Sequence, residues 1–483
     1  MRAFSLVALA GCILCTHPDL ALTEPLWLDD TLISQTAPGL NRVVIDARPD
    51  GSALYSHVSG DEAGERVGWY RSTDGGDSWA SFWTATWGIS NAVIGGAYGF
   101  DVLVNVWQAG GNLWRRTVDA TTGVQIGASI ITPTSLTARE IVVESNAETI
   151  PPGNEYFIAC GTFFDPSRNQ VTIVAFRSGD DGATWGDFNV LDAGPIGDPA
   201  AIGDMHLVFS RAGFPYFHVV YRKFGRLCHV RTANAGVSWE TPTELVLNVA
   251  TTTEVSVAAF GIFAVAVAES PAGQVVYCNS TDAGATWSAA SLIDGGEVGG
   301  RWPFVAFRGG YQVLYRQPDG RLATRWTATP ENPLSWTAEE YTSLGTTAYS
   351  PWAVGYGAGE VGAVYVRYDD GDRPYFISRT GTPAAVDGGA PAPPRVALDV
   401  FPTPSSGPFH LVWTTGVPPA GGEILDVAGR RVALLPAWSA DGRGYFATWN
   451  GRDARGRSLP SGIYFAHVAT PGGGQTARLV LMH

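Results

Sequence analysis

The chain has 483 residues, of which 45% are hydrophobic and only 16% charged, with 59 Gly and 31 Pro. This composition predicts many short strands joined by tight turns, and the length predicts more than one domain. The formal charge of −14 and the lack of basic runs exclude nucleic acid as an expected partner.

The first residues have the pattern of an export signal. Arg2 supplies a positive charge, and residues 4–15 are apolar. We therefore assign residues 1–21 to a signal peptide and expect a secreted or cell-surface protein. Residues 9–12 (LAGC) also resemble a lipoprotein cleavage box, so a lipid anchor on Cys12 is the alternative.

Three cysteines follow the signal: Cys160, Cys228 and Cys278. An odd number leaves at least one free thiol. All three lie in apolar stretches, which indicates small buried side chains. After the signal, no CxxC motif or His-rich cluster indicates a metal, and we expect no cofactor.

One octapeptide recurs along the chain. It begins at Ser72, Ser178 and Ser280, and a degenerate copy begins at Thr232. The pattern is S-x-D-x-G-x-x-W. The Ser and Asp side chains can accept backbone N–H groups in a tight turn, Gly allows a positive φ, and Trp buries a large ring between sheets. The motif therefore indicates scaffold rather than chemistry.

This octapeptide resembles the Asp box (BNR repeat) of the sialidase-like β-propellers. The copies stand 106, 54 and 48 residues apart, so one blade has lost its box near residues 119–123. A later blade retains only Trp336. We predict an all-β, sialidase-like β-propeller over residues 24–380, with seven blades and six as the alternative.

The seventh repeat, residues 350–379, has only three predicted strands. Residues 26–33 resemble the fourth strands of other repeats. We expect this N-terminal segment to complete the seventh blade, because ring closure removes an exposed sheet edge.

Residues 381–394 form a Gly/Pro/Ala-rich linker, and residues 395–483 contain seven short alternating segments that predict a β-sandwich. Residues 424–432, 449–453 and 461–465 resemble the C-terminal Ig-like modules of exported bacterial proteins, such as hook-capping and type IX secretion sorting domains. The resemblance implies surface display and contact with secretion machinery.

The propeller resemblance also implies a catalytic set. Sialidases bind the sugar carboxylate with three arginines and use a tyrosine nucleophile, which a glutamate activates, with an aspartate as acid/base. By this resemblance Tyr349 is the nucleophile, Glu254 its activator and Asp61 the acid/base. The candidate substrate-binding arginines are Arg42, Arg316, Arg321 and Arg301.

One position departs from this set, because Glu269 stands near the place of the family's second arginine, where it would repel a carboxylate. We therefore favour a monomeric binding propeller that recognises glycan or another extracellular polymer. Trp83, Trp87 and Trp107 are exposed-loop candidates for stacking on sugars, and packing within the blades is the equal alternative for each. A retaining exo-glycosidase of sialidase type is the first alternative, and a structural surface protein is the second.

Overall fold

The structure is a computed structural model built almost entirely of strands. It describes residues 27, 30–34, 40–48, 51–60, 66–86, 94–99, 101–146, 156–195, 202–210, 216–246, 248–250, 254–293, 300–341, 351–356, 360–367, 370, 373–379, 398–401, 409–413, 419, 421–427, 429–435, 438–440, 445–470 and 473–481. Within these ranges the helical element is the short 3-10 turn η1 (Pro333–Ser335), and no helix is long and apolar enough to cross a membrane. The signal segment and the linker lie outside the described residues.

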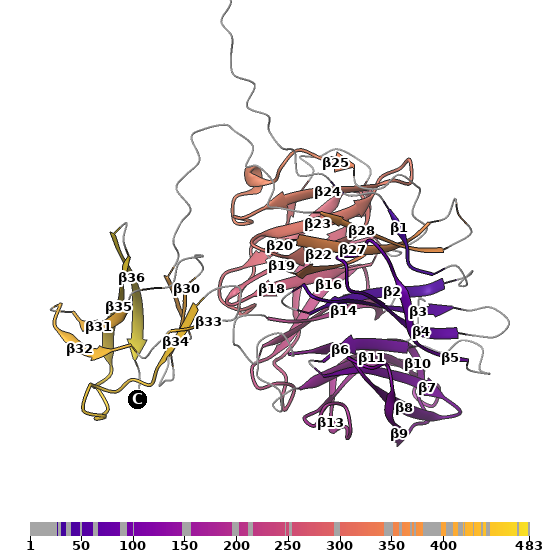
Figure 1. The fold of residues 1–483 in the computed structure, drawn as a ribbon, viewed down its shortest axis with the longest axis horizontal. Helices are drawn as coiled ribbons and strands as arrows, with labels where there is room; N and C mark the ends of the chain where they lie inside the picture. The colour runs from indigo at the N-terminus through magenta and orange to yellow at the C-terminus, as the bar shows by residue number, and fades with distance from the viewer. Residues whose placement is uncertain are drawn as a thin grey trace, which may run out of the picture.

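Seven four-stranded antiparallel sheets follow one another along the larger part of the chain (Figure 1). The first sheet contains β2 (Leu40–Ala47), β3 (Leu54–Gly60), β4 (Arg66–Ser72) and β5 (Ala80–Thr86). The second contains β6 (Ile94–Tyr98), β7 (Val102–Ala109), β8 (Asn112–Asp119) and β9 (Gln125–Pro133). The third contains β10 (Thr137–Ser145), β11 (Phe157–Asp165), β12 (Gln170–Ser178) and β13 (Gly186–Pro195).

The remaining sheets repeat this order. The fourth contains β14 (Ile202–Phe209), β15 (Phe217–Lys223), β16 (Arg226–Thr232) and β17 (Thr243–Val246). The fifth contains β18 (Ser256–Phe260), β19 (Phe263–Glu269), β20 (Val275–Ser280) and β21 (Ser291–Leu292). The sixth contains β22 (Arg301–Phe307), β23 (Tyr311–Arg316), β24 (Leu322–Thr327) and β25 (Glu340–Tyr341). The seventh contains β26 (Trp352–Tyr356), β27 (Glu360–Arg367), β28 (Arg373–Arg379) and β1 (Thr31–Leu32).

The first strands of the sheets form a closed ring. β2, β6, β10, β14, β18, β22 and β26 each lie beside the next, and β26 lies beside β2. Hydrophobic side chains of neighbouring sheets pack together, as where Ile158 of β11 shares a core with Leu207 of β14. This arrangement is a β-propeller, which confirms the predicted fold class.

The N-terminal strand completes the seventh sheet. β1 pairs with β28, and Trp27 forms a further bridge to Arg379. Ile33 is buried, and its N–H donates to the carbonyl of Pro374 at 2.9 Å. The segment therefore occupies the position expected from its sequence.

The four octapeptides form the same turn between the third and fourth strands. In each, the first hydroxyl accepts the N–H of the glycine at 2.8–3.0 Å. In the first copy Asp74 accepts the N–H of Ser78 at 3.0 Å, and the Ser78 hydroxyl, which donates to the same carboxylate, lowers the pKa of Asp74 to about 2. Glycine is required because Gly236 has φ 85°, and a Cβ there would lie 2.9 Å from Ile158 Cδ1.

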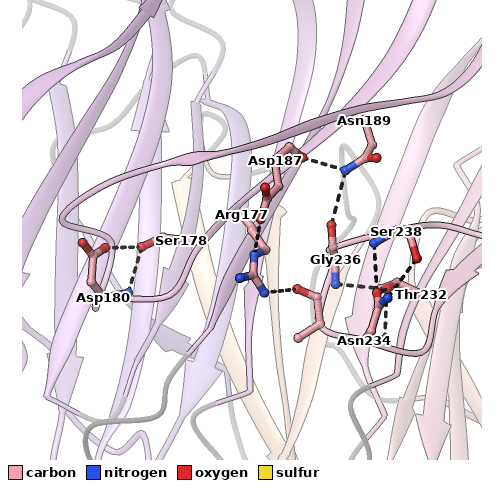
Figure 2. A network of polar contacts seen from close by, with 10 residues as sticks. Arg177, Ser178, Asp180, Asp187, Asn189, Thr232, Asn234, Gly236 and Ser238 are labelled. Atoms are coloured by element: carbon pink, nitrogen blue, oxygen red, sulfur yellow. Dashed lines mark hydrogen bonds and ion pairs between the residues drawn. The ribbon is translucent and has the colours of Figure 1, made fainter.

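The arginine just before the turn clasps the turn of the following sheet. Arg177 donates from Nη1 to the carbonyl of Ala235 at 3.3 Å. Figure 2 shows Arg177 directed toward the turn that contains Asn234 and Gly236. Arg231 donates in the same way to Ala283, and Arg71 donates to Thr121 at 3.1 Å. These bonds join sheets that share no backbone ladder.

Two further four-stranded sheets lie in the C-terminal part of the chain. The first contains β29 (Leu398–Phe401), β30 (Phe409–Trp413), β34 (Tyr445–Trp449) and β33 (Ser439–Ala440). The second contains β32 (Arg431–Leu434), β31 (Gly422–Asp426), β35 (Gly462–Thr470) and β36 (Gly473–Leu481). Phe409 and Trp413 of the first sheet share a core with Ile424 and Leu479 of the second, which is the packing of a β-sandwich.

Candidate functional site

Three aromatic rings fill the centre of the propeller at one level. The ring centroids of His206 and Phe304 lie 4.8 Å apart, those of His206 and Trp352 also 4.8 Å, and those of Phe304 and Trp352 4.9 Å. These residues come from β14, β22 and β26, so the contact crosses the ring. His206 Nδ1 also accepts the N–H of Val257 at 3.1 Å. Side chains of three inner strands thus meet across the ring.

Two of the three inner strands that carry these rings, β14 and β22, contain a β-bulge near their starts. In β14 the pairing register shifts between Gly203 and His206, and in β22 it shifts between Arg301 and Phe304. Each shift inserts one extra residue, which bends the strand and redirects a side chain. Both bulges lie near the starts of their strands, at one mouth of the ring.

Each bulge contains a residue in the left-handed backbone region. Asp204 has φ 50°, and Trp302, at the matching position, has φ 51°. This conformation is uncommon for residues other than glycine and is an outlier for a bulky side chain. It is further disfavoured for Trp302 because Pro303 follows it. Such strain persists only where surrounding contacts impose it, and it gathers at ligand sites.

An arginine at the end of the second strand faces each bulge residue. Arg222, which is buried, donates from Nε to Asp204 at 2.8 Å. Arg316 instead lies over the Trp302 ring, 5.3 Å from its centroid. The same backbone position thus carries an ion pair in the fourth sheet and a cation–π contact in the sixth.

A buried carboxylate lies beside Trp302. Glu269, at the end of β19, is 7% exposed, and its Oε1 lies 3.9 Å from Nε of the exposed Arg301. The backbone N–H of Trp302 points to Glu269 Oε2 at 3.5 Å. We call Glu269, Arg301, Trp302 and Arg316 the mouth cluster.

The structure brings together some of the predicted site residues and not others. Arg301 and Arg316 both lie in the mouth cluster, at paired positions of β22 and β23. Arg321 lies one turn away, where its Nη2 pairs with Asp319 at 2.7 Å. Glu254 is half-buried and precedes β18 rather than opening it.

The other predicted catalytic residues are not placed. Asp61 and Tyr349 lie outside the described residues. Arg42 lies in β2 opposite Ser59, and its side chain is also outside the described part.

The expectation that Trp107 lies in an exposed loop was wrong. Trp107 is 3% exposed within β7 and stacks on Trp114 at 6.1 Å. Trp83 is a half-buried strand residue of β5, and the guanidinium of Arg116 lies 4.8 Å from its ring. These rings pack within the sheets because alternate strand positions face the core. Trp87 lies outside the described residues.

Trp302 is not among the site residues predicted from the sequence, although it lies in the inner strand β22. A signal was present: a bulky aromatic directly before proline at the beginning of an inner strand. The column of arginines Arg222, Arg316 and Arg367, each at or next to the end of a second strand, also pointed to this level.

The described part of the chain also contains buried cysteines and side chains of metal-binding types. Cys160, Cys228 and Cys278 are buried and free, and burial raises the pKa of the Cys228 and Cys278 thiols to about 12. In the described part of the chain no three His, Cys, Asp or Glu side chains gather as a metal site. The mouth cluster can therefore bind through stacking, hydrogen bonds and charge.

No protein-family model matches this chain, and no curated protein matches it. Among solved structures it is similar to a lectin from Burkholderia pseudomallei, with 12% identity, 79% of this chain and 96% of the lectin covered, and a TM-score of 0.52. A variant of the NanB sialidase from Streptococcus pneumoniae is 14% identical. The match covers 77% of this chain and 72% of the sialidase, with a TM-score of 0.42. An α-L-arabinofuranosidase from Fusarium graminearum is 12% identical. The match covers 73% of this chain and 98% of the arabinofuranosidase, with a TM-score of 0.45. At 12% identity, the similarity to the lectin shows a shared fold alone.

Proposed function

We propose that this protein is an exported binding propeller that recognises glycan or another extracellular polymer at the mouth cluster. The observation that carries the proposal is Trp302, a half-buried indole held in a strained backbone conformation by its neighbours. An aromatic face with a few fixed polar groups beside it is the usual composition of a small-molecule site. One protein with this fold is named a lectin, so the fold accommodates the role.

The Glu269 carboxylate in the mouth cluster works against an acidic sugar beside Arg301. Glu269 lies between Arg301 and the Trp302 N–H, where it offsets the charge of the arginine. A carboxylate ligand at the same place would meet repulsion from Glu269. This supports binding through stacking and hydroxyl hydrogen bonds, and it disfavours the sialidase-type alternative.

Export rests on the N-terminal pattern of residues 1–21, and the C-terminal sandwich is proposed as an Ig-like sorting or attachment module. The repeated octapeptides are proposed as Asp boxes that serve the scaffold. Cell fractionation tests the export part. Without residues 1–21 the protein should remain in the cytoplasm.

The binding part is tested with a glycan array and the full-length chain. Trp302→Ala should lose at least tenfold in affinity for the glycans that the natural chain retains, while its melting temperature stays close to the natural value. Trp326→Ala is the matched control, because Trp326 is half-buried in β24 of the same sheet, near the end away from Arg316. If Trp302→Ala binds the array as well as Trp326→Ala does, the mouth cluster is not the site.

A further inference from the structure

The C-terminal sandwich has the opposite charge to the rest of the chain. Residues 395–483 contain eight arginines and five acidic residues, a formal charge of +3, which leaves −17 for the preceding residues of a chain at −14. Five of these arginines lie in two short segments. They are Arg430, Arg431, Arg452, Arg455 and Arg457, and we call them the arginine patch.

Two turns of the same design present the patch. In the first, Asp426 N–H donates to the Arg430 carbonyl at 2.9 Å, and Arg430 donates from Nε to Asp426 Oδ2 at 2.8 Å. In the second, the matching bonds join Asp453 and Arg457 at 2.9 and 3.0 Å. A glycine with positive φ precedes the closing arginine in both, Gly429 at 74° and Gly456 at 78°.

The two turns lie side by side. The N–H of Ala454 donates to the carbonyl of Val432 at 3.1 Å, which joins the second turn to the strand that follows the first. Arg430, Arg431 and Arg457 have side chains that are 81%, 61% and 72% exposed. Arg452 and Arg455 are exposed as well. The five exposed arginines therefore come from two adjoining segments, and Arg431 also pairs with Glu423 at 3.7 Å.

The turns fix the orientation of the guanidinium groups. Arg430 and Arg457 each contact their aspartate through Nε and Nη2, so three of their five N–H donors remain directed elsewhere. Among the described residues the Arg455 side chain makes no hydrogen bond or ion pair. A guanidinium with a fixed plane binds carboxylate and similar oxyanions with less loss of entropy.

We propose that the arginine patch binds an anionic polysaccharide, a flexible polymer with carboxylate groups along its length. Several guanidinium groups can then engage successive carboxylates of one polymer, which multiplies weak single contacts. Neither turn contains an aromatic residue on which a base could stack, unlike sites for single-stranded nucleic acid. The strong negative charge of the preceding residues also opposes approach to a broad anionic surface.

The test uses the full-length chain and fluorescent polygalacturonate at about 50 mM salt. Arg431→Gln/Arg455→Gln should weaken binding about tenfold, since neither side chain closes a turn, and raising the salt to about 300 mM should abolish the difference. Arg168→Gln/Arg226→Gln removes the same charge from exposed positions of the propeller and should bind as the natural chain does. Equal loss in both pairs would overturn the proposal, because it would show an effect of net charge alone.

Four further measurements separate the alternatives. Neutral dextran should not compete, and phosphatidylglycerol vesicles should not retain the protein; retention by vesicles without binding of polygalacturonate would overturn the proposal. Arg455→Gln alone, which breaks no described contact, should weaken binding about threefold. Trp302→Ala should leave polygalacturonate binding unchanged, so failure here and failure of the mouth cluster are distinguishable.

Discussion

Nδ1 of His218 lies 3.0 Å from Nε2 of His229, and both rings are buried in the fourth sheet. Burial, together with the charge of Arg231, lowers the pKa of His218 to about 3 and holds that of His229 well below its ordinary value. The centroid of Trp287 lies 4.9 Å from that of His229. Both rings are therefore neutral in the folded protein, and one donates to the other.

This pair predicts a loss of stability in mild acid. Because the folded-state pKa values lie below the ordinary value near 6.5, the unfolded chain binds more protons as the pH falls. The free energy of unfolding should decrease by up to about 1.4 kcal/mol per pH unit through His218 below about pH 6.5, and His229 should add to this loss. Urea denaturation at pH 7, 6 and 5 measures this slope.

The variant His218→Phe/His229→Phe removes both partners of the bond and should flatten the slope. His467→Phe changes a histidine of β35 that is half-buried and bonded to Thr476, and it should keep the slope. A double variant as sensitive to acid as the natural chain would show that other groups cause the effect.

The octapeptide turn allows a comparison of two aspartates. Asp74→Ala removes the acceptor of the Ser78 N–H and should cost about 1–3 kcal/mol of unfolding free energy. Asp77→Ala, at an exposed variable position of the same turn, should change stability by less than about 0.5 kcal/mol. Glycan binding should be the same in both. If Asp74→Ala folds with natural stability but loses binding, the turn has a functional role.

The hydrogen bond from Arg177 to the next sheet predicts that substitutions of two arginines change stability unequally. Arg177→Gln loses the bond to the Ala235 carbonyl and an ion pair with Asp187, and should lower stability by about 1–2 kcal/mol. Arg168→Gln, whose side chain is 77% exposed, should have almost no effect. Thermal melts of the two variants decide the matter, and equal melting temperatures would mean that the clasp adds nothing.

Closure of the ring predicts strong dependence on the N-terminal strand. Deletion of residues 24–33 removes β1 and the buried Ile33, and leaves β28 as an exposed edge. We expect aggregation or a fall in melting temperature of more than 10 °C. Deletion of residues 395–483 is the control, because their core is separate from the propeller cores, and the melting temperature of the propeller should remain.

The strained backbone of Trp302 predicts that its replacement affects stability and glycan binding in opposite directions. Trp302→Gly should keep or raise stability, by up to about 1 kcal/mol, because glycine adopts φ 51° without strain, while glycan binding is lost. Asp204→Gly at the matching bulge should instead lower stability by about 1–3 kcal/mol, because it leaves the buried Arg222 without its carboxylate. A large destabilisation by Trp302→Gly would show that the indole serves packing.

Much of the fold could be predicted from the sequence because the controlling interactions are local. The octapeptide turns close through bonds between residues two to four positions apart, such as Ser178 with Gly182, so the motif itself encodes them. Alternation of apolar residues determines strands in the same way. In the C-terminal part, where alternating segments predict a β-sandwich, Phe409–Trp413 and Tyr445–Trp449 form β30 and β34.

The candidate site depended on the tertiary structure. Two bulges, which no spacing in the sequence reveals, place Asp204 and Trp302 at the mouth and change which residues face it. Trp107 is buried because it lies within the strand β7 of a packed sheet, although a tryptophan is also compatible with a loop. The sequence alone determined the repeats, the strands and the turns, since each depends on neighbours along the chain. Contacts across the ring, such as that of His206 with Trp352, depend on the pairing register of each inner strand. Only the tertiary structure determines this register.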